Sequence, residues 1–573
     1  MKRHFPPAAA LSLALSLALA PPVSLRAHLE AVPGEEGMVV SVHALASEAG
    51  VEILKKGGNA VDAAVATGLA LAAVFPSAGN LAGGGFMVVH LAEENRQTVI
   101  DYREEAPSAA TRDMYLDEDG EVLTDLGSAR IGWRASGVPG TVAGFALAFE
   151  RYGSGRVTWA ELVEPARRLA EGHVLTPGAV SSLRRAAPRL ERFEESKRIY
   201  LNGGAGWKAG GTWRQPELAA TLARLAEEGP REFYEGRTAE LIAAAMEENG
   251  GTIGREDLRA YRAIEREPLR QTYRGHLLVC PPPPCSGGAT LFQMLGMLEP
   301  HDVGGLGHNS AAKYHLFHEV MRRAFCDRIE YLGDPAFVEN PLGRMLDRDY
   351  LARRMADYDP ARATPSESVE PGLGPRESLE TTHYSIVDAE GSAVANTYTI
   401  RNSYGSAVTI PGAGLLMNNV MDDLAAKVGV PNQSGLMQGP ANEIAPGKRP
   451  LSSMTPTIVL KDDALFLVTG SPGGPTIINT VLQVVTNVVD FGMSAMDAVR
   501  APRVTHHWLP DTLVYERHGL SSDTVALLEA MGHSPKESGS LQGEAETILV
   551  DPTSGVRWGA ADPRLPDTRA VGY

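Results

Sequence analysis

The chain has 573 residues, a formal net charge of −17 and an apolar share of 43%. This length suffices for one large domain or several, and the apolar share is enough for a sizeable core. The acidic balance argues against nucleic acid as a partner, because phosphate backbones are bound by Lys and Arg.

The N-terminus has the features of an export signal. A basic start at Lys2 and Arg3 precedes an apolar stretch over residues 8–20, which is shorter than the roughly 20 residues that span a bilayer. The alternative is a disordered apolar terminus. We expect residues 1–27 to be a signal peptide and the mature protein to be periplasmic or secreted.

The next part of the chain is predicted to be mainly helical. Residues 41–56 have an amphipathic pattern. Residues 60–74 are apolar on most faces, and Asp62 within them favours a buried helix over a membrane span. Glycines then lead into a strand at 83–91, and periodic Leu and Ala predict helices over most of 140–260.

The middle of the chain changes character. Residues 355–380 are rich in Pro, Ser, Glu and Gly and show no buried face, which predicts a surface loop where a chain can be cut. Further elements are predicted beyond it: strands at 382–388, 393–400, 457–462 and 464–470, and helices near 476–490 and 521–531. Strands on both sides of a block of helices predict a sandwich with helices outside.

The three cysteines are Cys280, Cys285 and Cys326. Four prolines separate the first two, and a polyproline segment at about 3.1 Å per residue would hold their sulfurs roughly 15 Å apart. A disulfide requires Cα atoms within about 7 Å of each other. We therefore expect free, structural cysteines.

A hairpin is predicted around the turn at residues 389–391. Three residues ending in Gly fit a type I turn with a G1 bulge, in which the glycine supplies the positive φ. This register pairs Asp388 with Ser392 and, further out, Thr381 with Thr399. Cross-strand partners have Cβ atoms about 5 Å apart, so the two hydroxyls can touch. A turn one residue shorter would shift the pairing by one.

Strand propensity alone usually explains paired threonines on a hairpin. Here, however, the predicted loop ends directly before Thr381. A hydroxyl needs an adjacent base to become a nucleophile, and an N-terminal threonine carries one in its own α-amine, whose pKa is near 8. Cleavage between Glu380 and Thr381 would create that terminus, and we hypothesise that the chain cuts itself there.

The chain resembles the γ-glutamyltransferase (glutathione hydrolase) family of N-terminal nucleophile hydrolases over nearly its whole mature length. The resemblance implies a four-layer αββα sandwich of the α/β class, formed by a large subunit of residues 28–380 and a small catalytic subunit of residues 381–573. The matching blocks, in chain order, are GGNAVDAAVA (57–66), GGGFM (83–87), DYREEAP (101–107), GVPGTVAGF (137–145), PPPPCSGG (281–288), YLGDP (331–335), TTHYSIVD (381–388), NNVMDD (418–423), KRPLSSMTPT (448–457) and GSPGG (470–474).

The resemblance also implies a reaction. Thr381 would attack the carbonyl of Glu380, split the precursor, and then attack a γ-glutamyl amide such as glutathione. Water or an acceptor amino acid or peptide would resolve the acyl-enzyme. Thr399 matches the hydroxyl that supports the nucleophile. No cofactor is implied.

Substrate contacts carry over residue by residue. Arg103 matches the arginine that holds the substrate α-carboxylate, a bidentate task suited to a guanidinium, and Ser452 and Ser453 match serines on the same carboxylate. Gly473 and Gly474 match the glycines whose N–H groups form the oxyanion hole. Apart from the resemblance, a surface salt bridge and a plain turn would explain the arginine and the glycines.

Asp423 matches the acid that binds the substrate α-ammonium, and two positions near it depart from the family pattern. Arg401 stands where the family has Asn, with Asn402 next, and Val420 stands where it has Glu or Gln. These departures favour, as an alternative, an acylase for glutaryl-like groups without an α-ammonium. A local bulge that turns Arg401 away in favour of Asn402 would instead leave γ-glutamyl specificity intact. A flap tyrosine of some members is replaced by Ser434.

No metal is expected. The stretch HEVMR (318–322) begins like a zinc-protease helix but has Arg322 where the second His must be. His506 and His507 are adjacent, and on one strand they would face opposite sides, which favours packing and hydrogen bonding over a shared metal. A further alternative is an inactive binding protein that stays one chain near 61 kDa.

Overall fold

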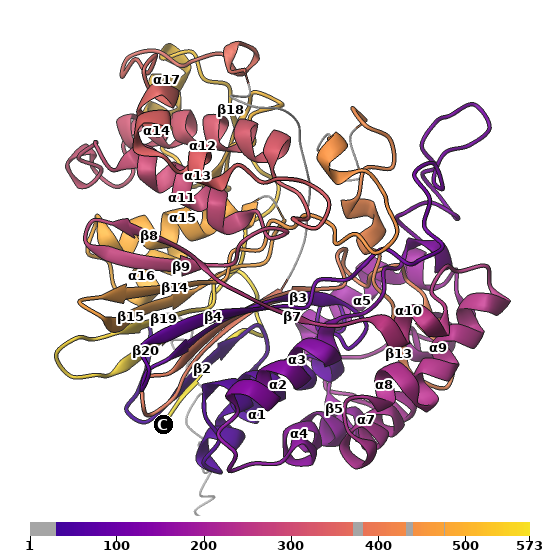
Figure 1. Cartoon of the computed structure of the whole chain (residues 1–573). Coiled ribbons are helices and arrows are strands. Elements are labelled where there is room, and N and C mark those ends of the chain that lie inside the picture. The colour runs from indigo at the N-terminus through magenta and orange to yellow at the C-terminus, as the bar shows by residue number, and fades with distance from the viewer. Residues whose placement is uncertain (1–29, 371–381, 431–438, 475) are drawn as a thin grey trace, which may run out of the picture.

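The computed structural model of the protein describes residues 30–370, 382–430, 439–474 and 476–573. Two seven-stranded sheets lie face to face, with helices on the outer side of each (Figure 1). This arrangement confirms the αββα fold expected from the sequence. The predicted signal peptide, the cleavage residues Glu380 and Thr381, and Ser434 lie outside the described residues.

The first sheet has the predicted hairpin at its centre. Its strands, in spatial order, are β21 (Arg569–Gly572), β2 (Met38–Ser41), β10 (Thr382–Val387), β11 (Ala393–Thr399), β3 (Gly84–Leu91), β4 (Arg96–Asp101) and β7 (Ile264–Arg266). Every residue of β10 and β11 is buried, because one face packs on helices and the other on the second sheet.

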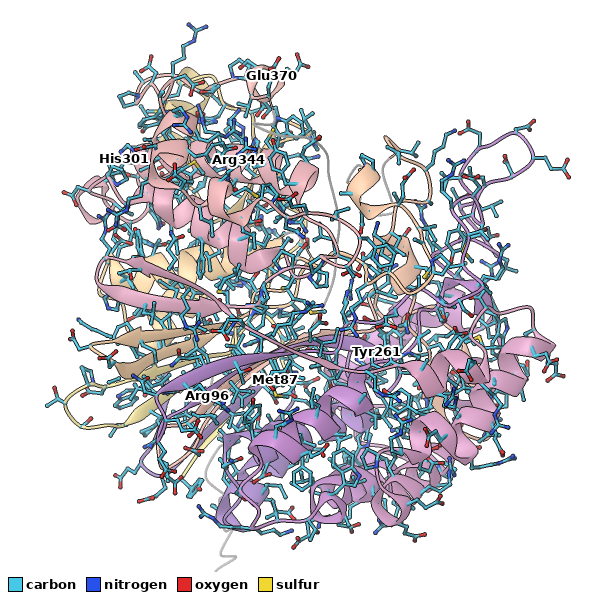
Figure 2. All side chains as sticks on the ribbon, in the orientation of Figure 1. Met87, Arg96, Tyr261, His301, Arg344 and Glu370 are labelled. Carbon is cyan, nitrogen blue, oxygen red and sulfur yellow. The ribbon has the colours of Figure 1, made fainter. Side chains whose placement is uncertain are left out.

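The second sheet contains the predicted pair at 457–462 and 464–470 as an antiparallel hairpin. Its strands, in spatial order, are β1 (Val32–Gly34), β20 (Arg557–Ala560), β19 (Thr547–Val550), β15 (Ala464–Thr469), β14 (Thr457–Lys461), β9 (His276–Cys280) and β8 (Leu269–Tyr273). Val88 and Ala395 of the first sheet pack against Ile458 and Val468 of the second in one core. Met87 belongs instead to the core on the helix side, as period-two alternation requires (Figure 2).

Helix α2 is the buried helix expected over residues 60–74, and each of its residues is buried. Asp62, which argued against a membrane span, forms a capping box with Asn59 at its N-terminus. The helices on this side are α1 (Ala44–Lys55), α2 (Ala60–Val74), α3 (Thr141–Tyr152), α4 (Trp159–Glu171), α5 (Pro177–Leu190), α6 (Glu194–Tyr200), α7 (Pro216–Glu228), α8 (Glu232–Glu235), α9 (Arg237–Glu248) and α10 (Arg255–Ala260). In the described parts of the chain, no helix has both the length and the apolar character needed to cross a membrane.

The second sheet is covered by helices from both sides of the predicted cleavage site: α11 (Gly287–Leu298), α12 (Ala311–Tyr331), α14 (Arg348–Arg354), α15 (Thr476–Val489) and α16 (Ala495–Arg500). Two further helices lie outside these, with α13 (Leu342–Met345) against α11 and α17 (Ser522–Ala530) against α12. The described residues also form two short strand pairs, β5 (His173–Val174) with β6 (Thr212–Trp213) and β12 (Thr409–Ile410) with β13 (Leu415–Leu416). A small three-stranded sheet consists of β16 (Val504–Thr505), β17 (Leu513–Tyr515) and β18 (Pro535–Glu537). All three cysteines are buried and free, which confirms that prediction.

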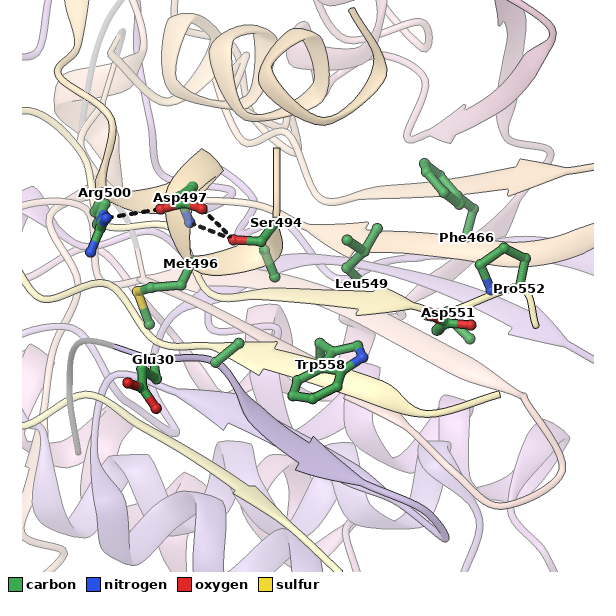
Figure 3. A pocket seen from close by; sticks show the side chains of 13 residues that line it. Glu30, Phe466, Ser494, Met496, Asp497, Arg500, Leu549, Asp551, Pro552 and Trp558 are labelled. Atoms are coloured by element: carbon green, nitrogen blue, oxygen red, sulfur yellow. Dashed lines mark hydrogen bonds and ion pairs between the residues drawn. The ribbon is translucent and has the colours of Figure 1, made fainter. Parts of the chain in front are cut away.

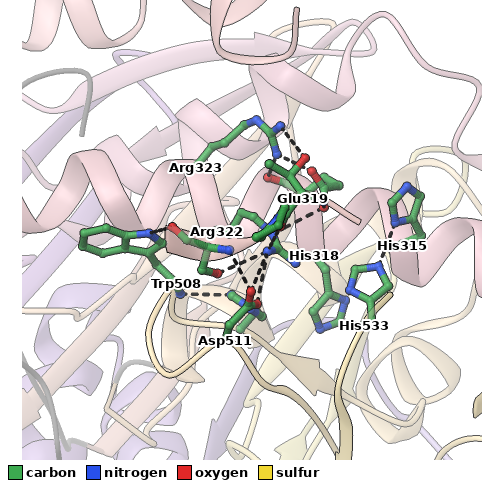
Figure 4. A network of polar contacts seen from close by, with 12 residues as sticks. His315, His318, Glu319, Arg322, Arg323, Trp508, Asp511 and His533 are labelled. Atoms are coloured by element: carbon green, nitrogen blue, oxygen red, sulfur yellow. Dashed lines mark hydrogen bonds and ion pairs between the residues drawn. The ribbon is translucent and has the colours of Figure 1, made fainter. Parts of the chain in front are cut away.

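The first part of the predicted surface loop is fixed, which corrects the expectation that residues 355–380 lack a buried face. Ser366 is fully buried. Its N–H donates to Asp511 at 2.7 Å and its carbonyl accepts from the Trp508 indole at 2.7 Å, while Arg322 of α12 donates to its hydroxyl at 3.2 Å. Figure 4 shows Arg322, Trp508 and Asp511 gathered in this network. Composition does not reveal it, because the segment is held largely through its backbone.

Candidate active site

The β10–β11 hairpin has the register expected from the sequence. Thr382 is the partner of Tyr398, and the Asp388 N–H donates to the Ser392 carbonyl at 3.0 Å. Gly391 has φ +89°, as a G1 bulge requires. One further step of the same ladder would make position 381 the partner of Thr399. Thr381 itself lies outside the described residues, so this last pair stays a prediction.

Thr399 ends β11 and is 1% exposed. Its hydroxyl accepts a hydrogen bond from the Arg401 N–H at 2.7 Å, which fixes the bend at the end of the strand. On the other side the backbone of the GGGFM block approaches closely, since a Cβ on Gly83 would lie 1.9 Å from the Thr399 carbonyl oxygen. The glycine there is therefore required to bring β3 against the end of β11.

Arg401 turns toward Asp423 and not away from it. Arg401 has φ +75°, and its Nε donates to Oδ1 of Asp423 at 3.0 Å. Its Nη2 lies 2.6 Å from Oδ2 of Asp422. Its Nη1 donates to the Asn402 side chain. The bulge that would substitute Asn402 for Arg401 is thus absent among these described residues.

Arg103 binds the same carboxylate from the other side. Its Nη2 donates to Oδ2 of Asp423, and its Nη1 lies 3.1 Å from Glu104. The two guanidinium groups therefore hold both oxygens of Asp423 in a site that is almost closed to solvent. Asp422 and Glu104 are acidic partners that the sequence did not single out, although each is adjacent to a predicted site residue.

Burial raises the pKa values of the Glu104 and Asp422 carboxyl groups. Burial raises the pKa of Glu104 to about 7, against the opposing attraction of Arg103. One of its carboxylate oxygens is buried without a hydrogen bond. Burial likewise raises the pKa of Asp422 above its usual value, although Arg401 and Arg130 favour its ionised form. Near neutral pH, Glu104 is therefore poised between its charged and neutral forms.

The segment that carries Ser452 and Ser453 contacts Arg103 directly. Arg103 Nε donates to the Pro450 carbonyl at 3.1 Å, two residues before Ser452. The Ser452 N–H donates to the Pro284 carbonyl at 2.8 Å, and the Ser453 hydroxyl accepts from Arg328 at 2.8 Å. Val420 is fully buried and packs against the backbone of Gly137. A Cβ added to Gly137 would lie 2.5 Å from Cγ1 of Val420.

Gly473 and Gly474 precede α15 and both have positive φ, at +122° and +65°. A Cβ on Gly473 would lie 2.5 Å from the Thr476 hydroxyl, so a side chain does not fit there. Backbone N–H groups before a helix start are suited to an oxyanion, because those groups lack partners within the helix and the helix dipole favours negative charge.

Of two cavities described next, only the first is lined by predicted site residues. One of about 1070 Å³ is lined by Gly473 and Arg401 together with α5 and residues 538–544. The other, of about 770 Å³, lies between α16 and strands β19 and β20 and has Trp558 on its wall (Figure 3). None of the predicted site residues lines the second cavity.

One cluster among the described residues brings three potential metal ligands together. Ligand atoms of His315, Glu319 and His533 all lie within 4.8 Å of one another (Figure 4). The two imidazoles already hydrogen-bond each other at 2.7 Å. Glu319 forms ion pairs with Arg322 and Arg323, and these two cations oppose the entry of another.

The adjacent histidines His506 and His507 contact different side chains. β16 ends at Thr505, so His506 and His507 follow the strand and do not belong to it. His506 binds Asp511 at 3.0 Å, whereas His507 packs its ring 5.0 Å from Phe325. The two side chains therefore have separate partners, as the packing interpretation expected.

Comparison with known proteins places these features in a family. The family model described as gamma-glutamyltranspeptidase matches residues 46–572. The glutathione hydrolase proenzyme of Escherichia coli strain K12 is 46% identical over 561 residues, covering 97% of this chain and 95% of that protein. The acylase ACY 1 proenzyme of Pseudomonas sp. strain SE83 is 37% identical over 545 residues, covering 93% of each.

Similar solved structures also include both an acylase and a gamma-glutamyltranspeptidase. The cephalosporin acylase from Bacillus halodurans superposes with a TM-score of 0.83 at 26% identity, covering 95% of this chain and 97% of that chain. The gamma-glutamyltranspeptidase of Helicobacter pylori superposes with a TM-score of 0.56 at 40% identity, covering 58% of this chain and 94% of that chain.

Proposed function

This chain belongs to the gamma-glutamyltranspeptidase family, and on that premise we propose that it is an exported precursor that cuts itself and then transfers γ-glutamyl groups from glutathione-like amides to water or an amine. Residues 1–27 would be removed on export. Residues 28–380 and 381–573 would remain together as large and small subunits, because strands from both build each sheet.

In the proposed maturation, the Thr381 hydroxyl attacks the Glu380 carbonyl. The peptide C–N bond breaks, the acyl group moves to the threonine oxygen as an ester, and the α-amine of Thr381 takes up the proton. Water then hydrolyses the ester and frees the carboxylate of Glu380. The observation that supports this proposal is the β10–β11 register, in which Thr382 is the partner of Tyr398; continued by one residue, it would pair position 381 with Thr399.

In the proposed turnover, the Thr381 α-amine accepts the hydroxyl proton while the oxygen attacks the γ-carbonyl of the substrate. Gly473 and Gly474 N–H groups stabilise the oxyanion, and the leaving amine takes the proton. The acyl-enzyme ester is then attacked by water or by an acceptor amine, which restores the threonine hydroxyl.

The head group of a γ-glutamyl substrate suits the Arg103–Asp423 ion pair. That head group carries an α-carboxylate and an α-ammonium on one carbon. Inserted between the two side chains, it would give its carboxylate to Arg103 and its ammonium to Oδ2 of Asp423, so each buried charge exchanges one partner for another. The hydroxyls of Ser452 and Ser453 would complete the carboxylate site.

A second candidate is an acylase for glutaryl-like groups, favoured by one observation: Arg401 already holds Oδ1 of Asp423. An incoming ammonium must share Asp423 with that guanidinium. A glutaryl carboxylate needs only Arg103 and leaves the Asp423–Arg401 pair intact.

One experiment separates these activities. The processed enzyme is assayed with γ-glutamyl-p-nitroanilide and glutaryl-p-nitroanilide, with the Thr381→Ala protein as the control. A higher kcat/KM for the γ-glutamyl compound supports the first function, and the reverse order supports the acylase. Turnover of both by Thr381→Ala would contradict the proposed nucleophile.

A further inference from the structure

We propose that the hydroxyl groups of Ser471 and Thr476 are positioning groups, which aim the backbone N–H groups of Gly473 and Gly474 at the oxyanion of the reacting carbonyl. The inference rests on the proposed function, which assigns the oxyanion to these two glycines, and it adds the side chains that set the direction of both donors. It applies equally to a γ-glutamyl and a glutaryl substrate, because both carbonyls develop the same oxyanion.

The two glycine N–H groups are donors whose direction must be fixed. Among the described residues, neither the Gly473 N–H nor the Gly474 N–H has an acceptor. Both glycines have positive φ, and a glycine backbone can adopt many other conformations. An oxyanion donor is effective only when it already points at the place where the charge develops. Other groups must therefore hold these peptide units in one orientation.

The orientation of each N–H follows from the carbonyl of the same peptide unit. A trans peptide unit is planar, so its C=O and its N–H point in opposite directions. The Gly473 N–H shares its unit with the Pro472 carbonyl, and the Gly474 N–H shares its unit with the Gly473 carbonyl. Both units are trans. A group that holds one of these carbonyls therefore aims the N–H on the opposite side.

Each of these two carbonyls accepts a hydrogen bond from a hydroxyl. The Ser471 hydroxyl donates to the Pro472 carbonyl at 2.7 Å. The Thr476 hydroxyl donates to the Gly473 carbonyl at 2.6 Å, and the Thr476 N–H adds a longer bond to the same oxygen at 3.3 Å. Both oxyanion peptide units are thus held from the side opposite to their N–H groups.

Ser471 is itself tied to a distant part of the chain. The residue is fully buried, and its hydroxyl accepts a hydrogen bond from the Glu544 N–H at 2.9 Å. The next N–H, that of Ala545, donates to Asp562 at 2.8 Å, and Asp562 forms a buried ion pair with Arg503 at 2.6 Å. The Ser471 hydroxyl therefore joins the oxyanion loop to a segment that a buried ion pair fixes.

Close packing leaves this junction little room to adjust. A Cβ on Gly543 would lie 2.9 Å from Ser471 Oγ and 2.4 Å from Thr480 Oγ1. A Cβ on Gly473 would lie 3.2 Å from the Gly543 Cα. The backbone beside Glu544 thus packs directly on the oxyanion loop, and the Ser471 hydroxyl is a polar link between the two.

The test measures p-nitroaniline release by processed Ser471→Ala from whichever anilide, γ-glutamyl or glutaryl, the wild type prefers. Thr469→Val is the control, because Thr469 is also buried and its hydroxyl bonds to Thr547 at 2.8 Å, away from the oxyanion loop. We expect the kcat of Ser471→Ala to fall about tenfold or more. Its KM should stay within about twofold, because acylation and deacylation both pass through an oxyanion and slow together. Thr469→Val should keep the wild-type kcat.

Thr476 supplies a second, independent pair of variants. Thr476→Val removes the hydroxyl and Thr476→Ser keeps it, so kcat should fall about threefold or more in the first and stay near the wild-type value in the second. A further readout is the Ki of a substrate analogue in which a boronic acid replaces the reacting carbonyl group, since its adduct with the Thr381 hydroxyl is tetrahedral and anionic. That Ki should rise by the factor by which kcat falls. A role in stability alone would lower the Tm and leave kcat and this Ki unchanged.

A wild-type kcat in Ser471→Ala, or an equal kcat in Thr476→Val and Thr476→Ser, would overturn the inference. If Ser471→Ala is not processed into two subunits, the Thr476 pair decides alone. Failure of the proposed function would look different, because the wild type itself would then turn over neither anilide, and the inference would fall with it.

Discussion

The guanidinium Nε of Arg401 lies 3.0 Å from Oδ1 of Asp423, and both side chains are buried. The residue proposed to bind a substrate ammonium therefore already has a permanent cation. Substrate choice depends on whether an ammonium can share this carboxylate with Arg401, since like charges about 4 Å apart repel by roughly 1 kcal/mol in water-like surroundings and by more in a closed pocket.

Replacing Arg401 with Asn and Val420 with Glu should improve γ-glutamyl binding. The change frees Oδ1 of Asp423 and adds an acidic group nearby, so we expect the KM for γ-glutamyl-p-nitroanilide to fall about fivefold or more, with kcat less affected. Arg130→Gln is the matched control, because Arg130 contacts Asp422 at 3.5 Å and makes no ion pair with Asp423 among the described residues. An unchanged KM in the double variant would show that Arg401 does not limit γ-glutamyl binding.

Thr399→Val should slow both self-cleavage and turnover. Valine keeps the strand shape but removes a hydroxyl that accepts from Arg401 N–H, and one such lost hydrogen bond costs about 1–3 kcal/mol. Cleavage is followed on denaturing gels and turnover by p-nitroaniline release. Thr397→Val, which removes the hydroxyl bonded to His383 on the same strand, is the control and should lower the Tm without blocking cleavage. Wild-type rates in Thr399→Val would refute the proposed pairing.

The hairpin illustrates what the sequence alone could predict. Gly391 in a three-residue turn fixes the register of β10 and β11, and no distant contact is needed to deduce it. The burial of α2 and the absence of a disulfide between Cys280 and Cys285 were also predictable, because the apolar pattern of a helix and the length of a proline segment are local properties of the sequence. The resemblance placed Arg401 near Asp423 but left its orientation open, because the direction of that side chain depends on the bend after β11. The fixed position of Ser366 depends on Asp511, which is 145 residues away.

Glu104 should make stability depend on pH. Its pKa is raised from 4.5 to about 7, so its contribution is fully present below about pH 4.5 and is lost as pH rises through about 7. The loss is on the order of 3 kcal/mol. In the Thr381→Ala background, Glu104→Gln should therefore have a higher Tm than its parent at pH 8 and a similar Tm at pH 4.5. Parallel Tm curves for the two proteins would contradict this role.

Arg322→Met should loosen the segment before the predicted cleavage site. The change leaves fully buried Glu319 with one cation fewer and removes contacts to Thr364, Ser366 and Asp511, and breaking a buried ion pair typically costs about 3–5 kcal/mol. We expect a lower Tm and new proteolytic cuts within residues 357–370. Arg344→Met, on short helix α13, is the control and should show neither. Resistance of Arg322→Met to protease would show that the network does not hold the segment.

The most direct measurement is the N-terminal sequence of the small fragment, made on the wild type, Thr381→Ser and Thr381→Ala. Self-cleavage by Thr381 predicts a fragment that begins at Thr381 and a larger one that ends at Glu380. Thr381→Ser should still be cut, because a hydroxyl remains, whereas Thr381→Ala should stay a single chain. A new terminus at Thr382, an intact wild-type chain, or equal cleavage of Thr381→Ala would contradict the account.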